Sequence, residues 1–248
     1  MPSSETFDFR GPAGRLEAIL VLPETPPVAA AVVCHAHPLH GGMMHFKVVF
    51  RAAKALQSAG LAALRFNFRG VGRSEGAHDH GAGEQEDARA ALFELQDRFP
   101  GLPLVLGGFS FGSVVALRVA ARDPRVRAVF ALGYPLRMAD HLPGTSPLRM
   151  AGHLPGTSPL RVADHLPGTS PVSLAADHAY LTSIARPRLF VQGEHDEFGP
   201  GEALRALAEP LLPPREIVVV PAANHFFDGQ LDALQGAVAD WAEARPWD

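Results

Sequence analysis

The chain has 248 residues, of which 47% are hydrophobic and 19% are charged, and a formal net charge of −4 at pH 7. These values are typical of a single folded domain over residues 1–248, and they give no reason to expect nucleic acid or an anionic membrane as a partner. No apolar run reaches the ~20 residues that span a bilayer, and residues 1–10 lack the apolar core of a signal peptide. Together with the single cysteine, Cys34, these features predict a cytoplasmic protein.

Apolar runs of strand length alternate with segments of helical pattern along most of the chain. Strands are expected at 6–10, 15–22, 28–34, 61–68, 102–107, 126–132, 187–192 and 216–220, and helices at 46–59, 84–98, 110–121, 200–212 and 231–245. The first two strands predict an antiparallel hairpin at a sheet edge. The alternation that follows predicts a doubly wound α/β fold: a mostly parallel sheet with helices on both faces and an active site at the carboxyl ends of the strands.

Residues 136–171 interrupt this alternation with three near-identical copies of twelve residues. The copies read LRMADHLPGTSP, LRMAGHLPGTSP and LRVADHLPGTSP. Two prolines and a Gly-Thr-Ser in each copy argue against one long helix or a central strand. One interpretation is a surface loop lengthened by duplication, since loops tolerate insertion at little entropic cost. The other is a partial cap over the active site, because the segment leaves from the carboxyl end of a strand.

Ser110 stands in a Gly-x-Ser-x-Gly stretch, GFSFG at 108–112, between an expected strand and an expected helix. This pattern is typical of a nucleophilic serine on a tight strand-to-helix turn, where the glycines let neighbouring backbone pass closely. The helix that follows points its N-terminal N–H groups at the reaction centre. A plain helix cap is the alternative role of Ser110, but the strand before it and the helix after it favour the nucleophile.

Two other strand ends supply a base and an acid. His225 follows the last expected strand, so that its imidazole lies in a loop at the carboxyl edge, where it can take a proton from Ser110 and return it. Asp196 follows the preceding strand and would hold His225 in the required tautomer. Glu197 is the nearest substitute for Asp196. The sequence therefore predicts Ser110, Asp196 and His225 as catalytic residues.

The loop after the strand at 28–34 is expected to complete an oxyanion hole. One donor should be the backbone N–H of Phe111, and the other comes from this loop, with Leu39 favoured and His37 as the alternative. Pro38 has no N–H and is excluded. The same region holds a cluster of histidines without an accompanying carboxylate or a zinc-binding spacing, so no metal is expected; they are His35, His37, His40 and His45.

The chain resembles the α/β-hydrolase superfamily over nearly its whole length, in its Ser–Asp–His order and in four segments. The segments are HAHP at 35–38 with Gly41-Gly42, RFNFRGVG at 65–72, GFSFG at 108–112 and GEHD at 193–196. They are most similar to a small bacterial, esterase-like branch near dienelactone hydrolase. The resemblance implies hydrolysis of an acyl bond through a covalent acyl-enzyme, without a metal or organic cofactor. Serine replaces the nucleophilic cysteine of dienelactone hydrolases proper, which shifts the expectation toward ordinary esters.

These features predict a carboxylic-ester hydrolase that acts on a small-molecule ester. The chain has no room for a large lid domain, so short acyl chains are expected. An amidase or peptidase with the same catalytic residues is the alternative within this chemistry. A non-catalytic binding protein on a hydrolase fold is the alternative from another class. Either a monomer or a homodimer agrees with the sequence.

Because the strand–helix alternation is complete on both sides of the repeat, we predict that removing two copies, twenty-four residues, leaves the protein folded. Thermal unfolding followed by circular dichroism measures this. Loss of a cooperative transition would show that the repeat packs in the core or in a dimer interface. An unchanged melting temperature with an altered substrate preference would identify the repeat as a cap.

Overall fold

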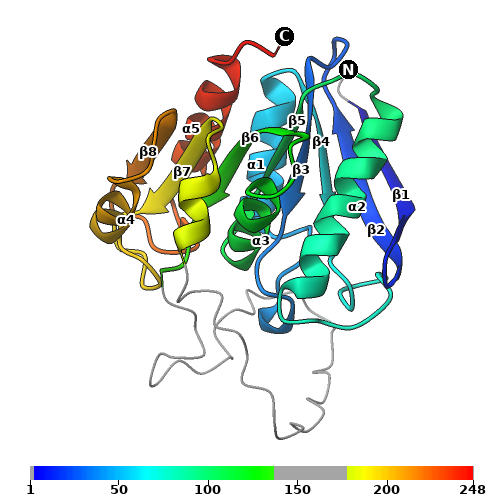
Figure 1. Cartoon of the computed structure of the whole chain (residues 1–248), viewed down its shortest axis with the longest axis horizontal. Helices are drawn as coiled ribbons and strands as arrows, with labels where there is room; N and C mark the ends of the chain where they lie inside the picture. Colours follow the sequence, from blue (N-terminus) through cyan, green and yellow to red (C-terminus); the bar gives the residue numbers. More distant parts are fainter. Residues whose placement is uncertain (1–2, 137–177, 248) are drawn as a thin grey trace, which may run out of the picture.

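The structure is a computed structural model that describes residues 3–136 and 178–247. Eight strands form one sheet in the order β1-β2-β4-β3-β5-β6-β7-β8 (Figure 1). They are β1 (Ser3–Gly11), β2 (Gly14–Leu22), β3 (Ala29–Cys34), β4 (Leu61–Phe66), β5 (Leu104–Phe109), β6 (Val126–Leu132), β7 (Arg188–Gly193) and β8 (Arg215–Val220). Apart from Leu136, the repeat at 136–171 lies outside the described residues. The two interpretations of the repeat, a surface loop or a cap over the active site, therefore both stay predictions.

The pairing of the strands confirms the predicted sheet. Strands β1 and β2 form an antiparallel hairpin in register from Ser3 opposite Leu22 to Gly11 opposite Gly14. Strand β2 also runs antiparallel to β4, and every later neighbour pair is parallel. Strands β3, β4, β5 and β7 are buried along their whole length, because helices cover both faces of the sheet.

Helices on the two faces of the sheet enclose separate hydrophobic cores (Figure 1). One face carries α2 (Ala82–Arg98), α3 (Phe111–Ala120) and α4 (Gly201–Ala208). The other carries α1 (Lys47–Ser58) and α5 (Leu231–Glu243), which also pack against each other. This confirms the doubly wound architecture. Among the described residues there is no lid subdomain, and none of their helices has the length and apolar character needed to cross a membrane.

Several element boundaries differ by a few residues from the sequence predictions, among them those of β5 and α4. Strand β5 continues through Gly107 and Gly108 to Phe109, beyond the end expected at residue 107. Gly107 serves packing here, since a Cβ on it would lie 2.4 Å from the ring of Phe130. Helix α4 ends at Ala208, before the expected residue 212, because Pro210 has no N–H to continue the helical ladder.

The carboxyl ends of the parallel strands share the lower edge of the sheet in Figure 1. The short 3₁₀ helix η1 (Pro38–His40), which the sequence did not predict, follows β3 at this edge. The long loop from β4 to α2 also passes here, and the side chain of Arg69 fastens it to α2 through two hydrogen bonds to the buried carboxylate of Asp87, at 3.0 and 2.7 Å. The loop after β3 and the loop from β4 to α2 therefore both lie at the carboxyl edge of the sheet.

Candidate active site

Ser110 occupies a strained turn between β5 and α3. Its φ of 54° and ψ of −120° are unusual for a residue that carries a Cβ. The glycines on either side make this turn possible, because a Cβ on Gly108 would lie 2.6 Å from the backbone of Gly112, and a Cβ on Gly112 would lie 2.4 Å from the carbonyl oxygen of His35. The turn leaves the Ser110 side chain only partly buried, at the carboxyl edge of the sheet.

The three residues that the sequence analysis selected come together in one hydrogen-bonded chain. His225 Nε2 lies 3.0 Å from Ser110 Oγ, and His225 Nδ1 lies 2.8 Å from Asp196 Oδ2. Since the carboxylate can only accept, Nδ1 carries the proton and Nε2 is left to accept the Ser110 hydroxyl proton. Asp196 and His225 are both buried, at 0% and 1% exposure, so water does not compete for these bonds.

Aromatic rings and a tight turn fix the two partners of Ser110. The ring of His225 lies between Phe109, Phe198 and Phe226, with centroids 5.0, 4.5 and 5.2 Å away. The carboxylate of Asp196 accepts the backbone N–H of Phe198 at 2.9 Å through its other oxygen, Oδ1. Both residues lie in loops at strand ends, after β7 and β8, and the packing gives each side chain one orientation.

Gln192 is a residue of this site that the sequence analysis missed. It lies near the end of β7 with its side chain fully buried, and its Nε2 donates to Asp196 Oδ2 at 2.9 Å. Its Oε1 accepts the backbone N–H of Tyr134 at 2.8 Å. The available signal was a lone polar side chain in the otherwise apolar run Leu189 to Gln192, since a buried amide needs partners.

The backbone donors near Ser110 favour His37, the alternative, over Leu39 as the second donor of the oxyanion hole, and the choice between them stays a prediction. The N–H of Leu39 already donates to His37 Nδ1, at 3.3 Å, in the cap of η1. The N–H groups of His37 and Phe111 have no acceptor within residues 3–136 and 178–247. The rings of these two residues lie 5.0 Å apart between centroids, so the loop after β3 contacts the first residue of α3. His37, the alternative, is therefore the better candidate for the second donor.

His35 supports this loop from inside the protein. Its Nδ1–H donates to the carbonyl of Ala36 at 2.6 Å, and its Nε2 accepts the backbone N–H of Phe68 at 3.0 Å. A neutral ring satisfies both partners, whereas a protonated ring would place a second hydrogen against the Phe68 N–H. Burial lowers the pKa of His35 to about 4. His35 thus joins the loop after β3 to the loop after β4.

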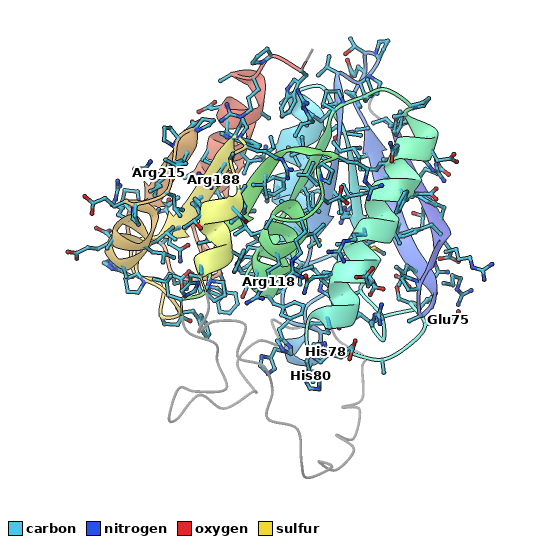
Figure 2. The ribbon with its side chains drawn as sticks, in the orientation of Figure 1. Glu75, His78, His80, Arg118, Arg188 and Arg215 are labelled. Atoms are coloured by element: carbon cyan, nitrogen blue, oxygen red, sulfur yellow. The ribbon has the colours of Figure 1, made fainter. Side chains whose placement is uncertain are left out.

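Four other histidines, His37, His40, His78 and His80, form a cluster at the same edge. His37 stacks on His40, with centroids 4.5 Å apart, and contacts His78 at 4.8 Å. Burial, followed by the neighbouring His40 and His78, lowers the pKa of His37 to about 3. Figure 2 places His78 and His80 at the lower edge of the molecule. In the part of the chain that the structure describes, no group of three or more potential ligands has the geometry to hold a metal ion.

Cys34 does not compete with Ser110 as a nucleophile. Its side chain is fully buried at the end of β3, and burial raises the pKa of the thiol. The nucleophilic form of cysteine is the thiolate, which this environment disfavours. Cys34 therefore packs as a small apolar side chain, as the sequence analysis expected.

Comparisons with known proteins agree with this geometry. Residues 27–159 match the family described as serine aminopeptidase, S33. The structure of an α/β serine hydrolase homologue from Coxiella burnetii is 33% identical, with 95% of this chain and 96% of that chain covered and a TM-score of 0.75. A lidless α/β serine hydrolase from Xanthomonas campestris is 32% identical, with 98% and 97% covered and a TM-score of 0.73. The esterase domain of a Rhodothermus marinus protein is 27% identical, with 97% and 95% covered and a TM-score of 0.65.

The chain therefore belongs to the α/β serine hydrolases. The resemblance to this superfamily, inferred from the four sequence segments, is confirmed. The narrower resemblance to the branch near dienelactone hydrolase stays a prediction.

The buried neutral state of His35 predicts an acid-sensitive fold. The unfolded chain binds a proton at this ring below pH ~6.5, whereas the folded chain binds it only below about 4, so stability is lost as the pH falls through this window. Between pH 7 and pH 5 this one residue should cost about 2 kcal/mol of unfolding free energy.

Urea unfolding of the wild type and of His35→Gln at both pH values measures this loss. The variant should lose about 2 kcal/mol less than the wild type over the same interval. The exposed His45 offers a control, because His45→Gln should keep the wild-type dependence on pH. An equal loss in wild type and His35→Gln would contradict the assignment of His35 as a buried neutral residue.

Proposed function

We propose that this serine hydrolase cleaves carboxylic esters, with Ser110 as nucleophile, His225 as general base and acid, and Asp196 as the residue that orients His225. The observation that carries the proposal is the continuous hydrogen-bonded chain from Ser110 Oγ through both nitrogens of His225 to Asp196. The esterase domain from Rhodothermus marinus, at 27% identity, supports an ester as the scissile bond. The proposal also includes three predictions from the sequence: the substrate is a small-molecule ester, the reaction needs no cofactor, and the protein acts in the cytoplasm.

The reaction follows from the positions of these groups. Ser110 Oγ attacks the ester carbonyl carbon while its proton passes to His225 Nε2, and Asp196 stabilises the imidazolium that forms. The carbonyl oxygen gains negative charge and accepts hydrogen bonds from the N–H groups of Phe111 and His37. His225 then gives its proton to the departing alcohol, which leaves an acyl group on Ser110. Water, deprotonated by His225, attacks this acyl group and releases the acid, while the proton returns to Ser110.

An amidase or peptidase activity is the second candidate, and the family description as a serine aminopeptidase favours it. The same residues would serve, but the leaving amine needs its proton from His225 before it departs. Comparable turnover of p-nitroanilides or dipeptides and of p-nitrophenyl esters would support this candidate over the esterase.

A labelling experiment tests the nucleophile and separates the hydrolase from a non-catalytic binding protein. We predict that a fluorophosphonate probe labels the wild type, fails to label Ser110→Ala, and labels His225→Ala about 100-fold or more slowly, because the base is missing. Ser58→Ala, at the far end of α1, is the matched control and should be labelled at the wild-type rate. An unlabelled wild type would favour the binding protein.

Acyl-chain preference tests the substrate class. We expect p-nitrophenyl acetate and butyrate to have a higher kcat/KM than long-chain esters, because the described residues contain no lid subdomain that would enclose a long acyl chain. The Xanthomonas campestris relative also lacks a lid. Steady-state kinetics over a series of acyl lengths measures this preference, and a maximum at long chains would contradict the short-chain assignment.

A further inference from the structure

Gln192 carries a polar side chain near the carboxyl end of β7, a strand that is buried along its whole length; the other buried polar side chain of β7, Arg188, lies at the opposite end. The exposed fraction of Gln192 is 0%. Both polar atoms of the amide have partners: the two hydrogens of Nε2 face the carbonyl of Gly199 at 2.6 Å, Asp196 Oδ2 at 2.9 Å and, at the longer distance of 3.3 Å, the carbonyl of Tyr134, while Oε1 accepts the N–H of Tyr134 at 2.8 Å. These partners come from two places, the loop between β7 and α4, which holds Asp196 and Gly199, and the chain after β6, which holds Tyr134.

The hydrogen bond from Gln192 to Asp196 restricts rotation of the carboxylate, and this rotation decides whether an oxygen of Asp196 faces His225. The carboxylate turns about its Cβ–Cγ bond unless both oxygens are held. The N–H of Phe198 holds Oδ1 at 2.9 Å. The other oxygen, Oδ2, faces His225 Nδ1 at 2.8 Å and would depend on that bond alone without the amide of Gln192.

The direction of the hydrogen bond also has an electrostatic effect. An N–H donor stabilises the ionised form of a carboxylate, and burial disfavours that form. Among the described residues, Asp196 has no lysine or arginine partner. Within residues 3–136 and 178–247, its carboxylate accepts from neutral donors, and the side chains among these are the amide of Gln192 and the imidazole of His225.

We propose that Gln192 is a positioning residue, which holds the carboxylate of Asp196 ionised and correctly oriented toward His225 and so sets the rate of acyl transfer. This inference rests on the proposed function. Gln192 does not touch the reacting atoms and acts only through Asp196. A merely structural cross-link between the β7–α4 loop and the chain after β6 would affect stability without changing kcat or its dependence on pH.

Two substitutions separate these roles. Gln192→Met keeps the length of the side chain but removes the donor, and kcat should fall about 10- to 100-fold with KM within about twofold, the usual size of an effect on a supporting hydrogen bond. Gln192→Glu keeps the shape and donates to Asp196 only while its own carboxyl is protonated. Its activity relative to the wild type should therefore fall as the pH rises from 6 to 9.

Rates are scaled to the fraction of enzyme that a fluorophosphonate titrates, so that loss of folded protein does not count as loss of kcat. Gln235→Met makes the same chemical change on α5, where the side chain accepts from Arg51, and should leave kcat unchanged. If Gln192 acts through Asp196, adding Gln192→Met to Asp196→Asn should lower kcat by less than about threefold further.

Three outcomes overturn the inference: a kcat for Gln192→Met within threefold of the wild type, full additivity of Gln192→Met with Asp196→Asn, or a constant activity ratio for Gln192→Glu across the pH range. If Gln192→Met does not fold, the Gln192→Glu profile decides alone. Failure of the proposed function is visible separately, since the wild type would then show neither labelling nor ester turnover before any variant is compared.

Discussion

The close crossing of backbone at the end of β5 is the constraint on which the site depends. The chain turns from strand to helix within one residue, and the carbonyl groups of Cys34 and His35 pass within 2.5 Å of where a Cβ on Gly112 would lie. Only glycine fits there, and Ser110 is forced to a positive φ as a result. The strain places the hydroxyl at the edge of the sheet, facing His225, and brings the N–H of Phe111 next to the loop after β3.

Around this crossing, the protein holds buried polar groups in defined charge states. The carboxylate of Asp196 accepts hydrogen bonds from the backbone of Phe198, from His225 and from Gln192, so that both of its oxygens have partners. His35 is kept neutral by one donor and one acceptor of the backbone. Each of these groups joins two loops, so the arrangement around Ser110 is made by hydrogen bonds between loops as well as by the two apolar cores.

The parts of the fold that depend on local pattern were predictable from the sequence. The hydrophobic periodicity located all eight strands. The Gly-x-Ser-x-Gly stretch and the positions of Asp196 and His225 at strand ends predicted the three residues that are joined by hydrogen bonds in the structure. The details that the sequence missed or left open depend on contacts that periodicity and motif spacing do not reveal. Gln192 has partners at Tyr134 and Gly199 that no local pattern reveals, and the choice between Leu39 and His37 depends on a ring nitrogen that caps η1. The continuation of β5 to Gly108 and Phe109 depends on their pairing with Ala131 and Leu132 of β6.

The central claim is that Ser110 carries the acyl group during turnover, and trapping that group tests it most directly. The enzyme is mixed with excess p-nitrophenyl butyrate, quenched in acid within the first turnovers, and analysed by intact mass and peptide mapping. The account predicts one butyryl group per chain, on the peptide that contains Ser110, and its disappearance once the substrate is consumed. Turnover without any acyl adduct, or an adduct on Cys34, on a histidine or on another serine, would contradict it.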